Sequence, residues 1–409
     1  MIAAKPRLPR HFLGWLSGAL ASQLGDVVLA FALGWAASAH GGVVAGVVVS
    51  AVSLPQMVLL LLGGAVGDRL GARQVMIVGD AVMLVVAVAV AVNWMGTPPV
   101  LLVVVALIIG TNNAFYLPSE GSMPRLLVGG DQLARALALR QSGSQLVSMI
   151  GAPLGGLLTA FAGLRTAAGA DALTFAIVLI VLIRIRPRYT RGPPGQRAHL
   201  LREAAEGVRL ALTTAAVRSP LLLVAGAAGL ILPFASILIP LVAREHSWNS
   251  SFAGVLVGAQ SLGTIVATLV ISRRGAGARP GLAALGALVV VGAGQLCVAL
   301  STLFGLIIAG AFLAGAGTGV FVSNLSPIML GAAPVAYVAR VQALLGLVQS
   351  AALLFATNAL GSLAHAAGPE TAIVVSAGAL GCCAIAGFVS APVRRLTSAG
   401  REVVRLPAR

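Results

Sequence analysis

The sequence has little charge: only 9% of its 409 residues are Asp, Glu, Lys or Arg, where a soluble protein carries roughly 25%. Cysteine is also scarce, and Cys297, Cys382 and Cys383 lie in apolar runs without ligand-type spacing, so we expect neither disulfides nor a metal site. No Gly-x-x-x-x-Gly-Lys-Ser/Thr stretch is present, which argues against an ATP-driven pump. Hydrophobic residues make up 58% of the chain. Most of its surface should therefore face lipid.

Long apolar runs dominate the chain. A helix needs about 20 apolar residues to cross a bilayer. The runs that meet this length are 12–38, 43–66, 75–95, 99–121, 138–162, 167–186, 220–243, 252–272, 281–301, 303–328, 340–364 and 370–392. The first is longer than the apolar part of a signal peptide, so we interpret it as an uncleaved membrane helix. We predict an all-α integral membrane protein with twelve transmembrane helices in two pseudo-symmetric six-helix bundles.

Basic residues alternate with the apolar runs. If each run crosses the membrane once, 25 of the 27 Lys and Arg residues fall on the side of the N-terminus, and only Arg165 and Arg244 fall opposite. Lys and Arg are retained on the cytoplasmic side, so both termini should be cytoplasmic. The net charge of +16 is spread over these loops and not gathered on one domain. We therefore expect no nucleic-acid binding.

One long loop divides the chain into halves. Residues 187–219 begin with prolines and continue as LLREAAEGVRLAL, whose apolar residues recur at helical spacing. We predict an N-terminal bundle over 1–190, a cytoplasmic linker with an amphipathic helix over 191–219, and a C-terminal bundle and tail over 220–409. A weak repeat supports two related halves, because Gly71-Ala-Arg73 recurs as Gly277-Ala-Arg279, 206 residues later.

A polar motif follows the second run. It is Gly-x-x-x-Asp-Arg-x-Gly-x-Arg, formed by Gly64, Asp68, Arg69, Gly71 and Arg73. Gly71 permits a tight turn with positive φ. Asp68 can accept hydrogen bonds from helix N–H groups and pair with an arginine. We interpret the motif as a latch between the cytoplasmic ends of the two halves, and the alternative is an ordinary short basic loop.

Few ionisable side chains lie inside the predicted spans. Charges in a bilayer are costly, so each is a candidate for function. Asp26 lies midway along the first run, and loss of water disfavours its charged form, which suits reversible protonation. We predict that Asp26 carries a coupling proton, with a structural hydrogen-bonding role as the alternative. For Asp80 we expect pairing with a loop arginine, and for Asp171 a structural role with Arg165.

The motif of residues 64–73 resembles the loop signature of the major facilitator superfamily. Three further stretches, at 114–127, 133–136 and 151–156, are similar to the branch that holds enterobactin exporters and macrolide efflux proteins. The resemblance covers nearly the whole chain. It implies a secondary transporter of a bacterial inner membrane, with the first, fourth, seventh and tenth helices lining a central cavity. One departure is Glu120, since members of that branch often have an arginine near this position.

The resemblance also indicates site residues. The cavity candidates are Gln23, Asn112, Asn113, Tyr116, Glu120, Gln145, Phe234, Phe321 and Asn324. Such sparse amides and aromatics favour lipophilic or amphipathic ligands. The stretch with Gly151, Pro153, Gly155 and Gly156 is similar to the antiporter signature of exporters, where it controls leakage. Plain helix packing is the alternative for these glycines.

Together these features predict a proton-coupled exporter of drugs or secondary metabolites, working by alternating access. Uptake of a nutrient or lipid-like solute is one alternative, and a transport-inactive scaffold or receptor is another. We expect no enzymatic activity and no cofactor. The expected partners are the lipid bilayer, protons and a small-molecule substrate, and the expected oligomeric state is monomeric.

The charge distribution makes a testable prediction about topology. Reporter domains fused within 187–219 and at the C-terminus should both be active only as cytoplasmic reporters, because basic loops stay on that side. A periplasmic signal from the 187–219 fusion would contradict the predicted number of crossings.

Overall fold

The computed structural model describes residues 8–94, 96–185, 215–275, 279–332 and 338–389, and all regular structure in these ranges is helical. Twelve spans are long and apolar enough to cross a membrane, which confirms the prediction. The helices are α1 (Arg10–Ser38), α2 (Gly42–Leu70), α3 (Ala72–Val92), α4 (Pro99–Leu127), α5 (Gly130–Ala162), α6 (Leu164–Arg184), α8 (Ala215–Pro233), η1 (Phe234–Leu238), α9 (Ile239–Glu245), α10 (Ser250–Arg274), α11 (Pro280–Leu300), α12 (Phe304–Ala332), α13 (Val338–Ala367) and α14 (Pro369–Val389). The elements α8, η1 and α9 together form the seventh span.

Two helix ends differ clearly from the prediction. The sequence places the end of the fourth helix near residue 121 and the start of the fifth near 138, whereas α4 continues to Leu127 and α5 begins at Gly130. Charged residues such as Arg125 and Arg135 end the apolar runs, but they are compatible with helix. Hydropathy therefore marks where a helix leaves lipid, while the backbone hydrogen bonding continues beyond that point.

The chain forms two compact units. Unit 1 comprises Met1–His40, Val47–Gly195 and Ser247–Gly258, and unit 2 comprises Gly41–Gly46, Gln196–His246 and Ala259–Arg409. Each unit thus includes the first residues of a helix whose remainder belongs to the other unit, α10 in one case and α2 in the other. The predicted amphipathic helix of the linker lies outside the described residues, because these resume at Ala215.

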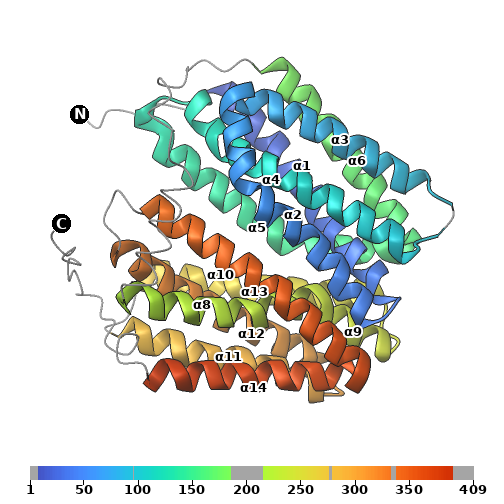
Figure 1. Ribbon diagram of the computed structural model, residues 1–409, viewed down its shortest axis with the longest axis vertical. Helices are drawn as coiled ribbons and strands as arrows, with labels where there is room; N and C mark the ends of the chain where they lie inside the picture. Colours follow the sequence, from blue (N-terminus) through green and yellow to red (C-terminus); the bar gives the residue numbers. More distant parts are fainter. Residues whose placement is uncertain (1–7, 95, 186–214, 276–278, 333–337, 390–409) are drawn as a thin grey trace. The chain divides into compact units, whose positions relative to one another are not determined.

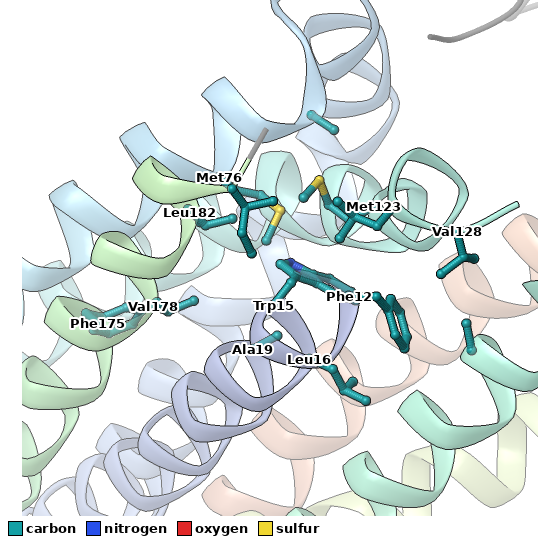
Figure 2. Packing of buried hydrophobic residues seen from close by; sticks show 14 of the residues in the cluster. Phe12, Trp15, Leu16, Ala19, Met76, Met123, Val128, Phe175, Val178 and Leu182 are labelled. Carbon is teal, nitrogen blue, oxygen red and sulfur yellow. The ribbon is translucent and has the colours of Figure 1, made fainter. Parts of the chain in front are cut away.

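Unit 1 is organised around contacts of α6 with α1 and α3 (Figure 1). Large apolar side chains fill the space where these helices meet α4. Phe12 and Trp15 of α1 pack with ring centroids 5.8 Å apart, and Met76 of α3, Met123 of α4 and Leu182 of α6 lie around them (Figure 2). All five side chains are fully buried. This cluster fixes the relative rotation of the four helices that carry Asp26, Asp80, Glu120 and Asp171.

Unit 2 contains a π-helical segment in its first span. Pro233 lacks a backbone N–H and its ring obstructs the regular helix, and the π-helix η1 begins at the next residue. One turn earlier, the Leu230 carbonyl accepts hydrogen bonds from Gln295 Nε2 of α11 at 3.2 Å and from Ser376 Oγ of α14 at 3.1 Å. Neighbouring helices therefore satisfy the backbone where the helix is irregular, as a lipid environment requires.

Close contact of α10 with α12 depends on glycine. A Cβ atom on Gly315 would overlap the carbonyl oxygen of Gln260, and one on Gly263 would overlap that of Phe312. The same contact carries a hydrogen bond of 3.0 Å from Thr264 Oγ1 to the Gly315 carbonyl. Backbone atoms cannot move aside as flexible side chains do, so these two glycines set the distance between the helices.

The contact between α10 and α12 predicts that an added methyl group destabilises the protein at Gly315 but not at a glycine with open space around it. Gly315→Ala should lower the free energy of unfolding by about 1 to 3 kcal/mol, because it forces two packed backbones apart. Gly286→Ala on α11 is the matched control, since a Cβ there meets nothing within 4 Å. It should be neutral or stabilising by up to about 1 kcal/mol. Thermal unfolding of the purified variants in detergent measures both, and equal effects would refute the packing argument.

Candidate functional site

Asp26 lies in the middle of α1, on an exposed part of that helix. Two polar residues, Ser22 and Gln23, lie about one turn before Asp26 on α1. Gln23 Nε2 donates a hydrogen bond of 2.6 Å to Ser144 Oγ of α5, and Ser22 is buried. The Gln23 amide therefore joins α1 to α5, and Asp26 has no ion pair with a basic side chain among the residues that the structure describes.

Glu120 of α4 forms an ion pair with Arg140 of α5. The Arg140 Nη2 to Glu120 Oε1 distance is 3.0 Å, and Nε lies 3.2 Å from the same oxygen. Both side chains are partly exposed. The acid at this position of helix four is thus matched by a base on helix five. Tyr116 lies one turn before Glu120 on α4 and is half-buried.

Asp80 of α3 does not have the arginine partner that we expected from its position. Its side chain is fully buried, and neither carboxyl oxygen has a hydrogen-bond partner within 3.5 Å, although the Tyr116 side chain of α4 interacts with this carboxyl group. The nearest loop arginine in sequence, Arg73, instead donates hydrogen bonds of 2.8 Å to the carbonyls of Leu182 and Ile183. The expected pairing is wrong because the unsatisfied carbonyls at the end of α6 take the guanidinium.

Asp171 of α6 also lacks its expected partner. Arg165 donates a hydrogen bond of 3.1 Å to the Ala91 carbonyl and stacks over the ring of Trp94, 3.8 Å from the ring centroid. Asp171 is fully buried, and the one described hydrogen bond to its carboxyl group is from Thr174 Oγ1 to Oδ1 at 3.2 Å. Its Oδ2 atom has no partner. The pairing of Asp171 with Arg165 is therefore wrong.

The motif of residues 64–73 is described only in part. Gly71 has φ of +93°, which confirms the predicted turn. The side-chain surroundings of Gly64 and Asp68 lie outside the described residues, and Arg69 is exposed. Arg73 binds α6 within unit 1, as given above. The latch between the two halves therefore stays a prediction.

Two glycines that the sequence analysis missed bring α2 close to α4. A Cβ on Gly63 would overlap the Ala114 carbonyl oxygen, and one on Gly67 would come within 2.8 Å of Ser119 Oγ. The signal was present, because Gly63 and Gly67 form a Gly-x-x-x-Gly pair in an apolar helix. The structure describes this contact of α2 with α4 for Gly63 and Gly67. It does not describe the surroundings of Gly64, the neighbouring glycine that belongs to the motif.

Unit 1 contains an apolar groove between α2, α3 and α4. Its volume is about 760 Å³, and its walls are mainly Val, Leu, Ile and Phe side chains. Among the cavity candidates, Asn112 lines this groove, next to Gly79, Thr111 and Gln74. Asn113 is half-buried and Gln145 is exposed on α5. The polar lining is thus confined to a few groups within an aliphatic surface.

The cavity candidates in unit 2 are buried. Phe234, Phe321 and Asn324 are 0%, 4% and 3% exposed. Asn324 Nδ2 donates a hydrogen bond of 2.8 Å to the Val320 carbonyl of its own helix. Their burial gives these residues a packing role in this structure and no support for substrate contact.

The glycines of the helix-five motif make close contacts inside unit 1. A Cβ on Gly151 would come within 2.9 Å of the Val27 side chain, and one on Gly155 within 3.0 Å of Phe31. Gly156 faces the start of α10, where Ser250 Oγ donates to its carbonyl at 3.0 Å. Pro153 faces Gly258 of the same helix. Packing accounts for each of these residues, and a role in leakage control remains a prediction.

The twelve apolar spans among the described residues are those of a polytopic membrane protein, and comparisons with known proteins define its family. The family model of the Major Facilitator Superfamily matches residues 15–242. That match covers more than half of the chain, so the chain belongs to the major facilitator superfamily.

Similar proteins include two kinds of exporter. The multidrug efflux pump Tap of Mycolicibacterium fortuitum is 27% identical over 266 residues, which cover 62% of this chain and 64% of the relative. The enterobactin exporter EntS of Shigella boydii is 29% identical over 231 residues, which cover 54% of this chain and 53% of the relative. The matches thus span between about half and two thirds of these relatives.

Solved structures agree on the fold. The nucleoside transporter NupG has a TM-score of 0.75 with 14% identity, covering 93% of this chain and 100% of that structure. A bacterial homolog of the human lysosomal transporter Spinster, inward-facing and unoccupied, has a TM-score of 0.75 with 13% identity, covering 95% and 98%. At these identities the likeness concerns the fold alone.

The contact of Arg73 with α6 makes a testable prediction. Arg73→Ala should lower the free energy of unfolding by about 1 to 2 kcal/mol, because two carbonyls at the end of α6 lose a charged donor. Arg73→Lys should restore only part of this, since an ammonium lacks the guanidinium fork. Arg69→Ala is the control, because Arg69 is exposed. If Arg73→Ala and Arg69→Ala unfold at the same temperature, the assigned contact of Arg73 with the end of α6 is excluded.

Proposed function

We propose that this protein is a secondary active transporter that exports small amphipathic or lipophilic molecules in exchange for protons. The observation that carries the proposal is Asp26, an accessible carboxyl group halfway along a membrane-spanning helix with no basic partner among the described residues. Membership of the superfamily supports transport, and the functions of the similar proteins, multidrug efflux and enterobactin export, support the outward direction.

The polarity of a groove in unit 1 supports the proposed substrate class. The groove is lined by aliphatic and aromatic side chains with a few amide and hydroxyl groups, and no charged side chain lines it. Such a surface favours molecules with large apolar parts over sugars or phosphates, which require many hydrogen bonds. The carboxylate of Asp26 adds a reason to favour cationic substrates.

Proton exchange on Asp26 provides the coupling step. The protonated carboxyl is neutral, and the deprotonated carboxylate attracts a cationic substrate, so a proton and a substrate compete for the same group. Transfer of one charge across the membrane contributes about 2.3 kcal/mol per 100 mV of membrane potential. Two conformations with different access to Asp26 would then convert an inward proton gradient into outward substrate movement.

The proposed setting is a bacterial inner membrane with both termini in the cytoplasm. Arginines at the ends of α2, α4, α6 and α10 support this orientation, since they lie at helix ends that alternating crossings place on one side. We propose a monomer as the transporting form.

Substitution of Asp26 tests the coupling. Asp26→Asn should abolish pH-gradient-driven efflux of a lipophilic cationic dye such as ethidium, because an amide cannot exchange a proton. Efflux is measured in cells that lack their own pumps, across a panel of drugs and dyes. The purified variant should unfold at the wild-type temperature, since Asn preserves the shape of the side chain.

Glu370→Gln is the matched control. It also removes a carboxylate, but at the start of α14 in unit 2, where Glu370 pairs with His246 at 3.2 Å. Efflux by this variant should equal that of the wild type. Undiminished efflux by Asp26→Asn would defeat the assignment of Asp26. Accumulation of the panel compounds by the wild type would contradict export, and the absence of any substrate-dependent flux would contradict transport.

A further inference from the structure

Two carboxyl groups are buried inside unit 1, away from the exposed Asp26. Asp80 of α3 and Asp171 of α6 are both 0% exposed. Three of their four carboxyl oxygens have no hydrogen-bond partner. Burying an unpaired carboxylate costs several kcal/mol, whereas the neutral acid is tolerated far better. The burial of each carboxyl group therefore indicates that it binds a proton, which removes its charge.

Helix packing places Asp171 against the backbone of α1 beside Asp26. A Cβ on Gly25 would overlap Asp171 Oδ1 and Thr174 Oγ1, so only a glycine before Asp26 leaves room for this carboxyl group. Thr174 Oγ1 donates to Asp171 Oδ1 at 3.2 Å and to the Asp171 carbonyl at 2.8 Å. The contact therefore holds the Asp171 side chain at the interface between α6 and α1.

A similar contact places Asp80 toward α4. A Cβ on the preceding residue, Gly79, would come within 2.6 Å of Asn112 Oδ1 and within 3.2 Å of the Tyr116 ring. The Tyr116 side chain interacts with the Asp80 carboxyl group, and α6, which carries Asp171, packs against both α1 and α3. The three carboxyl groups thus form one set within unit 1, connected through α6.

The three groups lie at different depths. Asp171 is seven residues from the Leu164 end of α6, or about 10 Å, and Asp80 is eight residues from the Ala72 end of α3, or about 12 Å. Three crossings separate these two helix ends, so they belong to opposite sides of the membrane. Asp26 lies in the middle of α1. The helices α3 and α6 are each 21 residues long, or about 31 Å, so Asp80 and Asp171 lie about 9 Å apart in depth, on either side of the membrane centre.

The surrounding charges do not neutralise this set. On the helices packed around it, the other titratable side chains described are Arg10 and His11 of α1, Arg73 of α3, Tyr116, Glu120 and Arg125 of α4, Arg135 and Arg140 of α5, and Arg165 and Arg184 of α6. Arg140 pairs with Glu120, while Arg73 and Arg165 bind backbone carbonyls. Within the described part of the chain, neither Asp80 nor Asp171 forms an ion pair with any of these cations.

We propose that Asp80 and Asp171 are further protonation sites of the transport cycle, which exchange protons with Asp26 as the accessible member. In each exchange a proton leaves the O–H group of one carboxylic acid and joins a carboxylate oxygen of another, so one group becomes charged as its neighbour becomes neutral. This inference rests on the proposed coupling role of Asp26. It predicts that unit 1 holds protons on Asp80 and Asp171 in addition to Asp26, the group that contacts the substrate.

Infrared titration of the full-length protein in lipid tests the inference without a substrate. The C=O stretch of protonated carboxyl groups is recorded as pH is raised, for the wild type and for Asp80→Asn, Asp171→Asn and Glu370→Gln. Each of the first two variants should lose one component of the buried-carboxyl band and shift the midpoint of the remainder, because the groups titrate as a set. Glu370→Gln should leave that band unchanged.

Efflux of ethidium at several external pH values supplies the second measurement. Asp80→Asn and Asp171→Asn should each displace the pH profile of efflux by roughly one pH unit, a tenfold change in proton concentration, since interacting groups of this kind couple at that level. Packing damage alone would lower efflux at every pH without displacing the profile. Both variants should unfold at the same temperature as the wild type while their pH profiles of efflux are displaced.

The two measurements separate failure of this inference from failure of the proposed function. If Asp26→Asn abolishes proton-driven efflux while Asp80→Asn and Asp171→Asn keep the wild-type pH profile and infrared band, the further sites are refuted and coupling by Asp26 stands. If the wild type shows no proton-driven efflux, the proposed function fails first. A band that loses components in both variants would then still support buried protonation sites.

Discussion

The cost of placing charge in lipid is the constraint on which this structure depends. It explains why 9% of the residues are charged and why arginines cluster at helix ends. It also explains how the arginines near the membrane are used, since Arg73 and Arg165 bind carbonyls that water would otherwise solvate. Against this background, the carboxyl groups of Asp26, Asp80 and Asp171 form no ion pair within the described residues, so charge pairing does not explain them. Reversible protonation gives them an explanation.

Close backbone packing holds the carboxyl groups in place. In lipid, helices associate through van der Waals contact and hydrogen bonds, because apolar burial gives no advantage over contact with lipid tails. Gly25 makes room for Asp171, and Gly79 brings α3 against Asn112 and Tyr116. Gly63 and Gly67 set the distance from α2 to α4 in the same way. The glycine-rich helices are thus part of the site, since their contacts decide which polar groups meet.

The sequence was sufficient for the twelve spans, because each depends on about 20 consecutive apolar residues. It could not place the ends of α4 and α5, where charged residues continue the helix beyond the apolar run. Nor could it give the partners of Asp80 and Asp171, since proximity in sequence suggested arginines that are used elsewhere. The burial of Phe234, Phe321 and Asn324 depends on the rotation of each helix, and a nearly uniform apolar helix gives little signal for rotation. Asp26 could be identified as a candidate from the sequence, because it is a single acid in a long apolar run.

Proton movement during transport is the most direct test of the account. Purified protein is reconstituted into vesicles that contain a pH-sensitive dye, and a gradient of ethidium is imposed with no initial pH difference. The account predicts that ethidium flowing down its gradient drives protons in the opposite direction, so that the pH inside the vesicles changes. Flow of ethidium with no change in internal pH would contradict it.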